Sequence, residues 1–300
     1  VNNDIITIKP EPNYNGDINV TLKVSDSQDI NDETLQTFIL SVVPTNDNPS
    51  IQGVQFDSTI AFINNYYQLG EDTLNTNFEL IYSDIDSDQS LNKTPYSLND
   101  LIWSFDKLDS EQDQKVFASK IEDGFIIDSL LSNYNGVTGL KVTVEDDSSL
   151  FDIFEIPIYI NPRNDSPKIT EVNLDADNFY NGYYYLAEDT IDVEFGVNYI
   201  DIDSDSLLNV SPYDINKLVW LFTKLDEEQE QKIFVSKKID SFVIDSVMSN
   251  YNGPTGFKII ATDNNNLYAE KDILIFLKQR NDIPNSFALN PKLKNYRLES

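Results

Sequence analysis

The sequence repeats itself with a period close to 117 residues, and a linker motif marks each repeat. The motif Asn46-Asp47-Asn48-Pro49 returns at 164–167 and again at 281–284, which are intervals of 118 and 117 residues. Proline cannot donate a ladder hydrogen bond, and it keeps the residue before it out of helical geometry, so each copy predicts a stiff crossing between β-modules. The predicted parts are the end of one module (1–45), two complete modules (46–163 and 164–280) and the start of a further segment (281–300).

Other motifs recur at the same offset and predict an all-β chain. The matched pairs are 71–73 with 188–190, 84–88 with 201–205, Trp103 with Trp220, and 133–136 with 250–253. Each complete unit contains about seven strand-like segments, which in the first unit lie near 51–56, 60–69, 76–82, 101–105, 115–120, 124–130 and 139–145, with a closing strand at 152–160. Short alternating segments separated by Asn, Asp and Gly turns indicate tandem seven-stranded Greek-key β-sandwiches, Ig-like in type and arranged end to end.

Composition narrows the range of functions. Asp and Glu number 51 against 21 Lys and Arg, a net charge of −30 that repels nucleic acid and anionic membrane surfaces. With no cysteine and no histidine, the chain offers no disulfide, zinc-thiolate or imidazole chemistry. No apolar run reaches the ~18 residues of a membrane-spanning helix. Because the chain begins inside a repeat, we expect it to be part of a longer protein whose targeting signals lie outside it.

Three alternating carboxylates are the strongest candidate for ligand chemistry. Asp84, Asp86 and Asp88 follow a predicted strand, and the pattern returns at 201–205. Carboxylates about 4 Å apart repel each other by a few kcal/mol at an effective dielectric near 20. A Ca2+ ion, which accepts 6–8 oxygen ligands, removes this repulsion. A dense cage of protein oxygens suits Mg2+ less well. A solvated acidic turn is the simpler alternative, but recurrence beside Glu71 and Glu188 favours Ca2+.

The order of these motifs resembles the cadherin repeat and its bacterial cadherin-like relatives. An Asn-Asp-x-Pro linker is followed by a Glu, an Asp-x-Asp, a late Asp and the next linker, over residues 1–284. The resemblance implies a first ion junction formed by Asn46, Asp47, the main chain of Asn48, Asp84, Asp86 and Asp146. It implies a second junction formed by Glu71, Asn164, Asp165, Asp201, Asp203 and Asp263. Asp26 would serve an upstream junction, and Glu188 and Asp282 one at the far end.

Two departures from the family reduce the number of carboxylates. Pro44, Pro162 and Gln279 stand where the family's linker begins with Asp, and an Asn-Tyr-Asn-Gly turn replaces its Asp-Arg-Glu turn. We therefore expect one or two ions per junction and a weaker affinity than in animal cadherins. The Asn-Tyr-Asn-Gly turns themselves are interpreted as backbone chemistry, with glycine at positive φ.

Aromatic residues could bind a sugar and paired carboxylates could catalyse a reaction, but we favour simpler interpretations of both. Trp103 and Trp220 are expected to fill the core from a central strand. Tyr66–Tyr67 and Tyr183–Tyr185 could form an exposed strip, although an edge strand with one outward face is the simpler interpretation. An active site is normally built once, whereas every carboxylate cluster here recurs with the repeat, so we predict that the chain is not an enzyme.

Together these features predict a Ca2+-binding, rod-like structural or adhesion region of a large secreted or cell-surface bacterial protein. Its partners would be neighbouring repeats of the same chain, with another cell-surface protein or a polysaccharide as open candidates. Carbohydrate-binding accessory modules of a secreted polysaccharide-degrading enzyme are the alternative from another functional class. A passive spacer is a third hypothesis.

Overall fold

The computed structural model describes residues 5–25, 33–108, 113–174, 178–225, 230–239 and 241–281. It divides into two compact units, each described by itself below. The first comprises Val1–Arg163 together with Ser206–Ser211, and the second comprises Asn164–Asp205 with Pro212–Ser300. Among the described residues, no helix is long and apolar enough to cross a bilayer.

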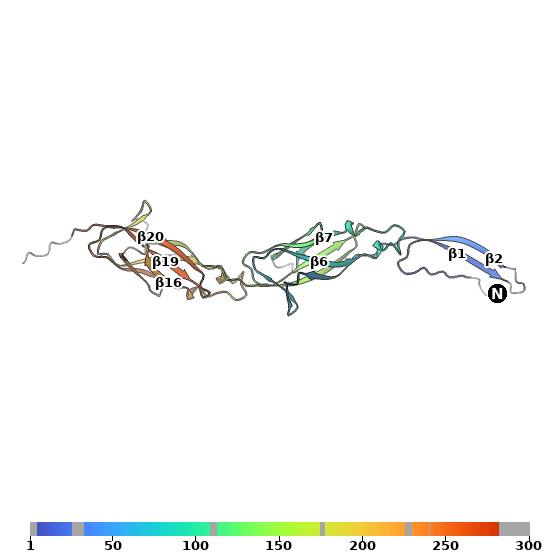
Figure 1. Ribbon diagram of the computed structural model, residues 1–300, viewed down its shortest axis with the longest axis horizontal. Coiled ribbons are helices and arrows are strands. Elements are labelled where there is room, and N and C mark those ends of the chain that lie inside the picture. The colour runs from blue at the N-terminus through green and yellow to red at the C-terminus, as the bar shows by residue number, and fades with distance from the viewer. Residues whose placement is uncertain are drawn as a thin grey trace, which may run out of the picture. The chain divides into compact units, whose positions relative to one another are not determined.

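The first unit contains a two-stranded hairpin and one β-sandwich (Figure 1). The hairpin strands β1 (Gly16–Ser25) and β2 (Glu33–Val42) pair antiparallel. One sheet of the sandwich has the order β3-β6-β9-β8, from strands Ser50–Phe56, Leu74–Ser83, Gly124–Leu130 and Val116–Ile121. The other has the order β4-β5-β11-β10-β7, from strands Phe62–Ile63, Tyr66–Gly70, Phe151–Asn161, Gly136–Glu145 and Ile102–Lys107.

The second unit repeats this sandwich strand for strand. One sheet has the order β12-β15-β18-β17, from strands Lys168–Asn173, Ile191–Ile200, Phe242–Val247 and Ile233–Lys237. The other has the order β13-β14-β20-β19-β16, from strands Phe179–Tyr180, Tyr183–Ala187, Tyr268–Lys278, Gly253–Thr262 and Val219–Lys224. In both units the pairs β5–β11 and β14–β20 are parallel, while every other paired strand is antiparallel. The all-β tandem-sandwich fold predicted from the sequence is confirmed.

Alternation along the strands forms each core. In β10, Leu140, Val142 and Val144 are fully buried, while Lys141 and Thr143 between them are only partly covered. Side chains of successive strand residues point to opposite faces, so this two-residue period places one apolar row against the facing sheet. Phe78 and Phe125 of that facing sheet pack with ring centroids 5.6 Å apart.

The two tryptophans pack as expected, but their strands lie elsewhere. Trp103 contacts the core with its ring 4.7 Å from Phe125 and 4.9 Å from Tyr82, and Trp220 repeats this against Phe242. Trp103 is on β7 and Trp220 is on β16, and each of these strands is the last in its sheet rather than a central one. The expectation of a central strand is therefore wrong, because a large side chain can reach the core from an edge strand when its inward face is covered by the other sheet.

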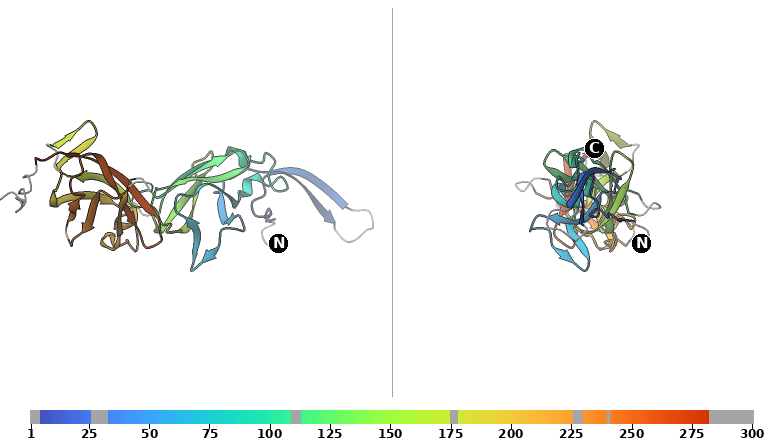
Figure 2. Two further views of the ribbon diagram at one scale, coloured as in Figure 1. Left: turned by 60° about the vertical axis from the view of Figure 1, so that its left-hand side comes forward. Right: turned by 90° about the vertical axis from the view of Figure 1, so that its right-hand side faces the viewer.

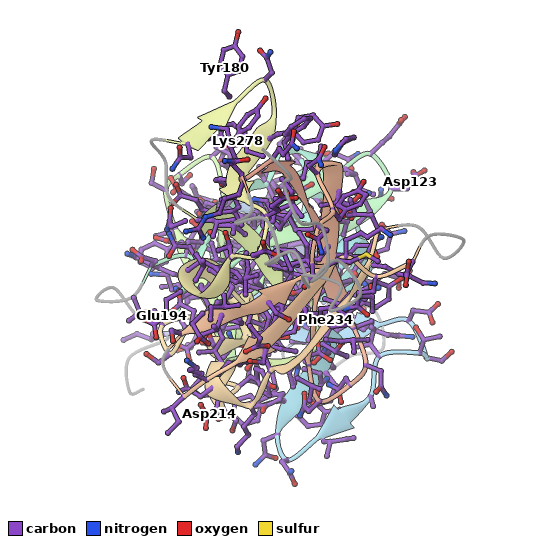
Figure 3. All side chains as sticks on the ribbon, turned by 90° about the vertical axis from the view of Figure 1, so that its left-hand side faces the viewer. Asp123, Tyr180, Glu194, Asp214, Phe234 and Lys278 are labelled. Carbon is purple, nitrogen blue, oxygen red and sulfur yellow. The ribbon has the colours of Figure 1, made fainter. Side chains whose placement is uncertain are left out.

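The segment expected as one strand at 60–69 is a short hairpin. β4 and β5 pair antiparallel, with Phe62 opposite Tyr67. Asn64 and Asn65 between them both have positive φ, which is the geometry of a type I′ turn. In the second unit the matching β13–β14 hairpin, coloured yellow, extends from its sandwich (Figure 2). Tyr180 at its tip points away from the sandwich (Figure 3).

Candidate metal centre

In the first unit the predicted carboxylates gather where β6 ends. Asp84 caps the 3-10 turn η1 (Ile85–Ser87): its Oδ1 accepts from the backbone N–H of Asp86 at 2.9 Å. The hydroxyl of Ser87 donates to the Asp84 carbonyl at 2.6 Å. A side-chain oxygen at this position satisfies an otherwise unpaired backbone N–H, so the Asp-x-Asp spacing itself makes the turn that holds both carboxylates.

The linker is fastened to two of these carboxylates. The backbone N–H of Asp47 donates to Oδ2 of Asp86 at 2.8 Å, and Nδ2 of Asn46 donates to Oδ2 of Asp146 at 2.7 Å. The other oxygen of Asp146 accepts from the backbone N–H groups of Ser148 and Leu150 at 2.8 and 3.0 Å. The structure thus brings together five of the six predicted ligand residues of this junction, from the linker, the β6 exit and the β10–β11 turn.

Asn48 is the sixth residue, and its side-chain Nδ2 donates to the carbonyl of Pro49 at 3.4 Å. The contribution of its main chain to an ion site stays a prediction.

The first cluster carries uncompensated negative charge. Asp84 and Asp146 are 4% and 2% exposed. Burial, reinforced by the charges of Asp86, Asp146 and Asp47, raises the pKa of Asp84, although the hydrogen bond from the Asp86 N–H opposes the shift. None of the ion pairs found among the described residues involves these four carboxylates.

The second unit builds the same arrangement. Nδ2 of Asn164 donates to Oδ2 of Asp263 at 2.7 Å, and the N–H of Asp165 donates to Oδ2 of Asp203 at 2.8 Å. Asp201 caps the turn Ile202–Ser204 and accepts from the N–H of Asp203 at 3.1 Å. Burial raises the pKa of Asp201 and of Asp203, and the neighbouring carboxylates add to both shifts.

The two predicted glutamates lie at the opposite ends of their sandwiches, next to the following linker. Glu71 is 3% exposed, and its carboxylate accepts from the N–H of Arg163. Glu188 is also 3% exposed, and its Oε1 accepts from the N–H of Arg280 at 2.6 Å. Each glutamate is therefore bonded to the residue that precedes an Asn-Asp-x-Pro motif. The other two predicted ligands, Asp26 and Asp282, lie outside the described residues.

These oxygen sets fit a hard divalent cation. Within the described part of the chain, Oδ2 of Asp201 is buried without a hydrogen-bond partner. An unpartnered buried carboxylate oxygen costs several kcal/mol unless a cation or proton compensates it. Carboxylate and amide oxygens, with no sulfur or imidazole, are the donors that Ca2+ prefers.

The tyrosines considered as a sugar-binding strip are half-buried. The hydroxyls of Tyr67 and Tyr184 donate to the carbonyls of Val54 and Val172 at 3.3 and 2.8 Å. Tyr185 lies under Nζ of Lys278, which is 4.8 Å from the ring centroid. The rings of Tyr67, Tyr184 and Tyr185 are therefore engaged by contacts within their own sandwich.

A set of buried asparagines was not predicted from the sequence. Asn15 and Asn135 in the Asn-Tyr-Asn-Gly turns, and Asn92 and Asn209 in the loops after the Asp-x-Asp turns, are all less than 8% exposed. The turns had been interpreted as backbone chemistry alone. The recurrence of Leu-Asn at 91–92 and 208–209 was the available sequence signal.

Comparison with known proteins finds only distant similarity to solved structures. No protein-family model matches the chain, and no curated protein matches it significantly. The chain is similar to PcdhgB3 EC1-4, with 13% identity and a TM-score of 0.48 over 88% of this chain and 58% of that one. It is similar to the human desmocollin-1 ectodomain, with 12% identity and a TM-score of 0.42 over 89% of this chain and 47% of that one.

A third similar structure is an endo-fucoidan hydrolase from glycoside hydrolase family 107, with 13% identity and a TM-score of 0.28 over 89% of this chain and 34% of that one. The chain therefore spans 58% or less of the length of these three structures. Resemblances this distant concern the arrangement of strands and say nothing about ligands or activity. In its strand arrangement the chain is similar to the first two of these structures, which are both ectodomains of the cadherin type.

Proposed function

We propose that this chain is a Ca2+-binding, rod-like structural or adhesion region of a secreted or cell-surface bacterial protein. One observation carries the proposal: in each unit the linker is hydrogen-bonded to one buried and one half-buried carboxylate, and neither has a cationic partner among the described residues. Such a cluster stays negatively charged at neutral pH only at a cost, which a divalent cation removes.

The ligand sets follow the sequence expectation. Asn46, Asp47, Asp84, Asp86 and Asp146 would hold ions at the first linker, with the main chain of Asn48. Asn164, Asp165, Asp201, Asp203 and Asp263 would hold ions at the second, joined by Glu71 as the resemblance implies. Glu188, Asp282 and Asp26 keep the same proposed role at the outer junctions. A bound ion would neutralise the carboxylates and tie the linker to the sandwich, which stiffens the junction.

The recurrence of one carboxylate set in both units also supports a structural role over catalysis. An active site is normally built once, whereas Asp84 and its repeat counterpart Asp201 cap the same turn in both units. Neighbouring repeats of the same chain are the proposed partners, and cell-surface proteins or polysaccharides remain candidates for an adhesion ligand.

Calcium titration tests the proposal. We expect isothermal calorimetry to detect saturable Ca2+ binding, with one or two ions per junction. Small-angle scattering should show a larger maximum dimension in Ca2+ than in chelator. Binding without any change of dimension would remove the stiffening role, and absence of binding would remove the proposal altogether.

A further inference from the structure

The Asn-Tyr-Asn-Gly turn before β1 is a docking element. The N–H of Asn15 donates to the Leu91 carbonyl at 2.9 Å, and its side-chain Oδ1 accepts from the N–H of Lys93 at 3.0 Å. Its Nδ2 donates to Oδ1 of Asn92. Three hydrogen bonds thus join a turn to a loop about 77 residues away, and both asparagine side chains are buried.

The loop is preorganised for this contact. Nδ2 of Asn92 donates to the carbonyls of Ile85 and Asp88 at 2.9 and 3.1 Å. An amide nitrogen has two protons, so both are used within the loop and Oδ1 is left to face the incoming asparagine. Buried amides that are fully paired in this way fix one partner geometry.

The first unit contains a second copy of the contact. The N–H of Asn135 donates to the Leu208 carbonyl at 2.9 Å, its Nδ2 donates to Asn209, and its Oδ1 accepts from the N–H of Val210 at 3.1 Å. Asn135 and Asn209 are 3% and 7% exposed. The pattern of donors and acceptors is the same at both places, so the contact is a property of the repeat.

The turn glycine belongs to the contact as well. A Cβ built on Gly136 would lie 2.5 Å from Cγ2 of Val210, and one built on Gly16 would lie 3.6 Å from Cβ of Lys93. The residue after the loop asparagine therefore covers the glycine in both copies. Both glycines also have φ of +128°, which other residues rarely adopt.

A third turn has the same geometry, and it makes no such contact with the described residues. Asn250 and Gly253 have φ of 57° and 127°, against 56° and 128° at Asn133 and Gly136. The hydroxyl of Tyr251 donates to the Pro254 carbonyl at 2.8 Å, as Tyr134 does to Val137 at 2.9 Å. Yet Asn252 is exposed, and a Cβ on Gly253 would meet only Tyr251 among the described residues.

We propose that the Asn252–Gly253 turn is a docking site for the Leu-Asn-x loop of a further β-sandwich of this repeat type. Asn252 would donate its N–H and Nδ2 to the leucine carbonyl and the asparagine Oδ1, and accept from the N–H of the next residue. The contact is made by neutral amides, so it forms with or without Ca2+ and does not depend on the proposed metal sites.

The test uses backbone hydrogen exchange at the three equivalent asparagines. In the 300-residue chain, the N–H groups of Asn15 and Asn135 are hydrogen-bonded and should exchange at least ~10-fold more slowly than that of Asn252. In an extended chain, residues 1–280 are followed by a second copy of 164–300, which places the copied Asn209 loop at its native spacing from Asn252. There the N–H of Asn252 should become as slow as that of Asn135, in chelator and in Ca2+ alike.

The control is an Asn→Ala change at the copied Asn209 position, which should restore fast exchange at Asn252 while the core amides of the appended sandwich stay protected. Fast exchange at Asn252 beside a protected appended core would overturn the proposal. It would equally be overturned, without any extended chain, if Asn135 exchanged as fast as Asn252 in the 300-residue protein. Protection that appears only in Ca2+ would assign the contact to the metal instead.

Discussion

Replacing Asp84 by asparagine should raise the stability of the Ca2+-free protein and reduce the stability that Ca2+ adds. Asparagine keeps the Oδ1 that accepts from the Asp86 N–H, so the turn is preserved and only the charge is removed. Asp84 is buried among Asp86, Asp146 and Asp47, whose charges all raise its pKa. At an effective dielectric near 20, one carboxylate pair about 5 Å apart repels by roughly 3 kcal/mol, which solvent and salt reduce.

We therefore expect Asp84→Asn to stabilise the Ca2+-free first sandwich by about 1–3 kcal/mol. Ca2+ at 100 times its Kd should stabilise the native protein by about 2.7 kcal/mol, and the variant should lose most of this gain. For a sandwich of this size, 1 kcal/mol corresponds to a Tm shift of about 4 °C. The expected pattern is a higher Tm than wild type in chelator and a much smaller rise of Tm when saturating Ca2+ is added.

Thermal unfolding followed by Trp103 fluorescence in a Trp220→Phe background reports the first sandwich alone. Asp88→Asn is the matched control, because Asp88 belongs to the same acidic motif but to neither proposed ligand set. It is exposed, and hydrogen bonds from Ser90 to its carboxylate lower its pKa. This control should leave the Ca2+ response intact. Equal behaviour of the two variants would refute the argument that buried repulsion, relieved by an ion, governs this turn.

Three further predictions address the same chain. Burial and neighbouring charge raise the pKa of Asp201 and Asp203, so their carboxyl groups bind protons more tightly in the folded state than in the unfolded state. In denaturant titrations, the Ca2+-free second sandwich should therefore gain stability as the pH falls from neutrality toward the ordinary carboxyl pKa of 3.8. Saturating Ca2+ should flatten this dependence of stability on pH. Gly256→Ala should lower the free energy of unfolding in urea by more than ~2 kcal/mol, because the added Cβ would lie 2.2 Å from a carbonyl oxygen of the paired strand. Gly53→Ala should lower it by less than ~1 kcal/mol, because the added Cβ would lie 3.8 Å from its nearest neighbour. Asn92→Ala should cost about 2–4 kcal/mol by leaving buried loop carbonyls and the Asn15 amide unpaired, and a change below ~0.5 kcal/mol would contradict the docking geometry.

The repeat and the two-residue alternation were enough to predict the sandwiches. Strand formation depends on side chains that alternate within one segment and on turn residues beside it. β10 and its counterpart in the second unit, β19, could therefore be recognised from residues 136–145 and 253–262. The same holds for the caps at Asp84 and Asp201, because an Asp two residues before a backbone N–H forms its turn locally.

From the sequence, the linker contacts could be predicted only as a cluster of carboxylates, without their hydrogen-bond partners. That Asn46 donates to Asp146, 100 residues away, depends on β10 and the linker meeting at one end of a sandwich. Sequence spacing shows which side chains recur, whereas the hydrogen-bond partner of a buried amide is set by the packing of distant segments.

The asparagine contacts depended entirely on tertiary structure. Asn15, Asn135 and Asn252 occupy identical turns, so no local property distinguishes them, yet two are buried and one is exposed. The difference arises because a loop dozens of residues away along the chain covers Asn15 and Asn135. Local sequence is enough to specify the strands, turns and carboxylates of each repeat, whereas the packing of distant segments selects which of the equivalent turns has a partner.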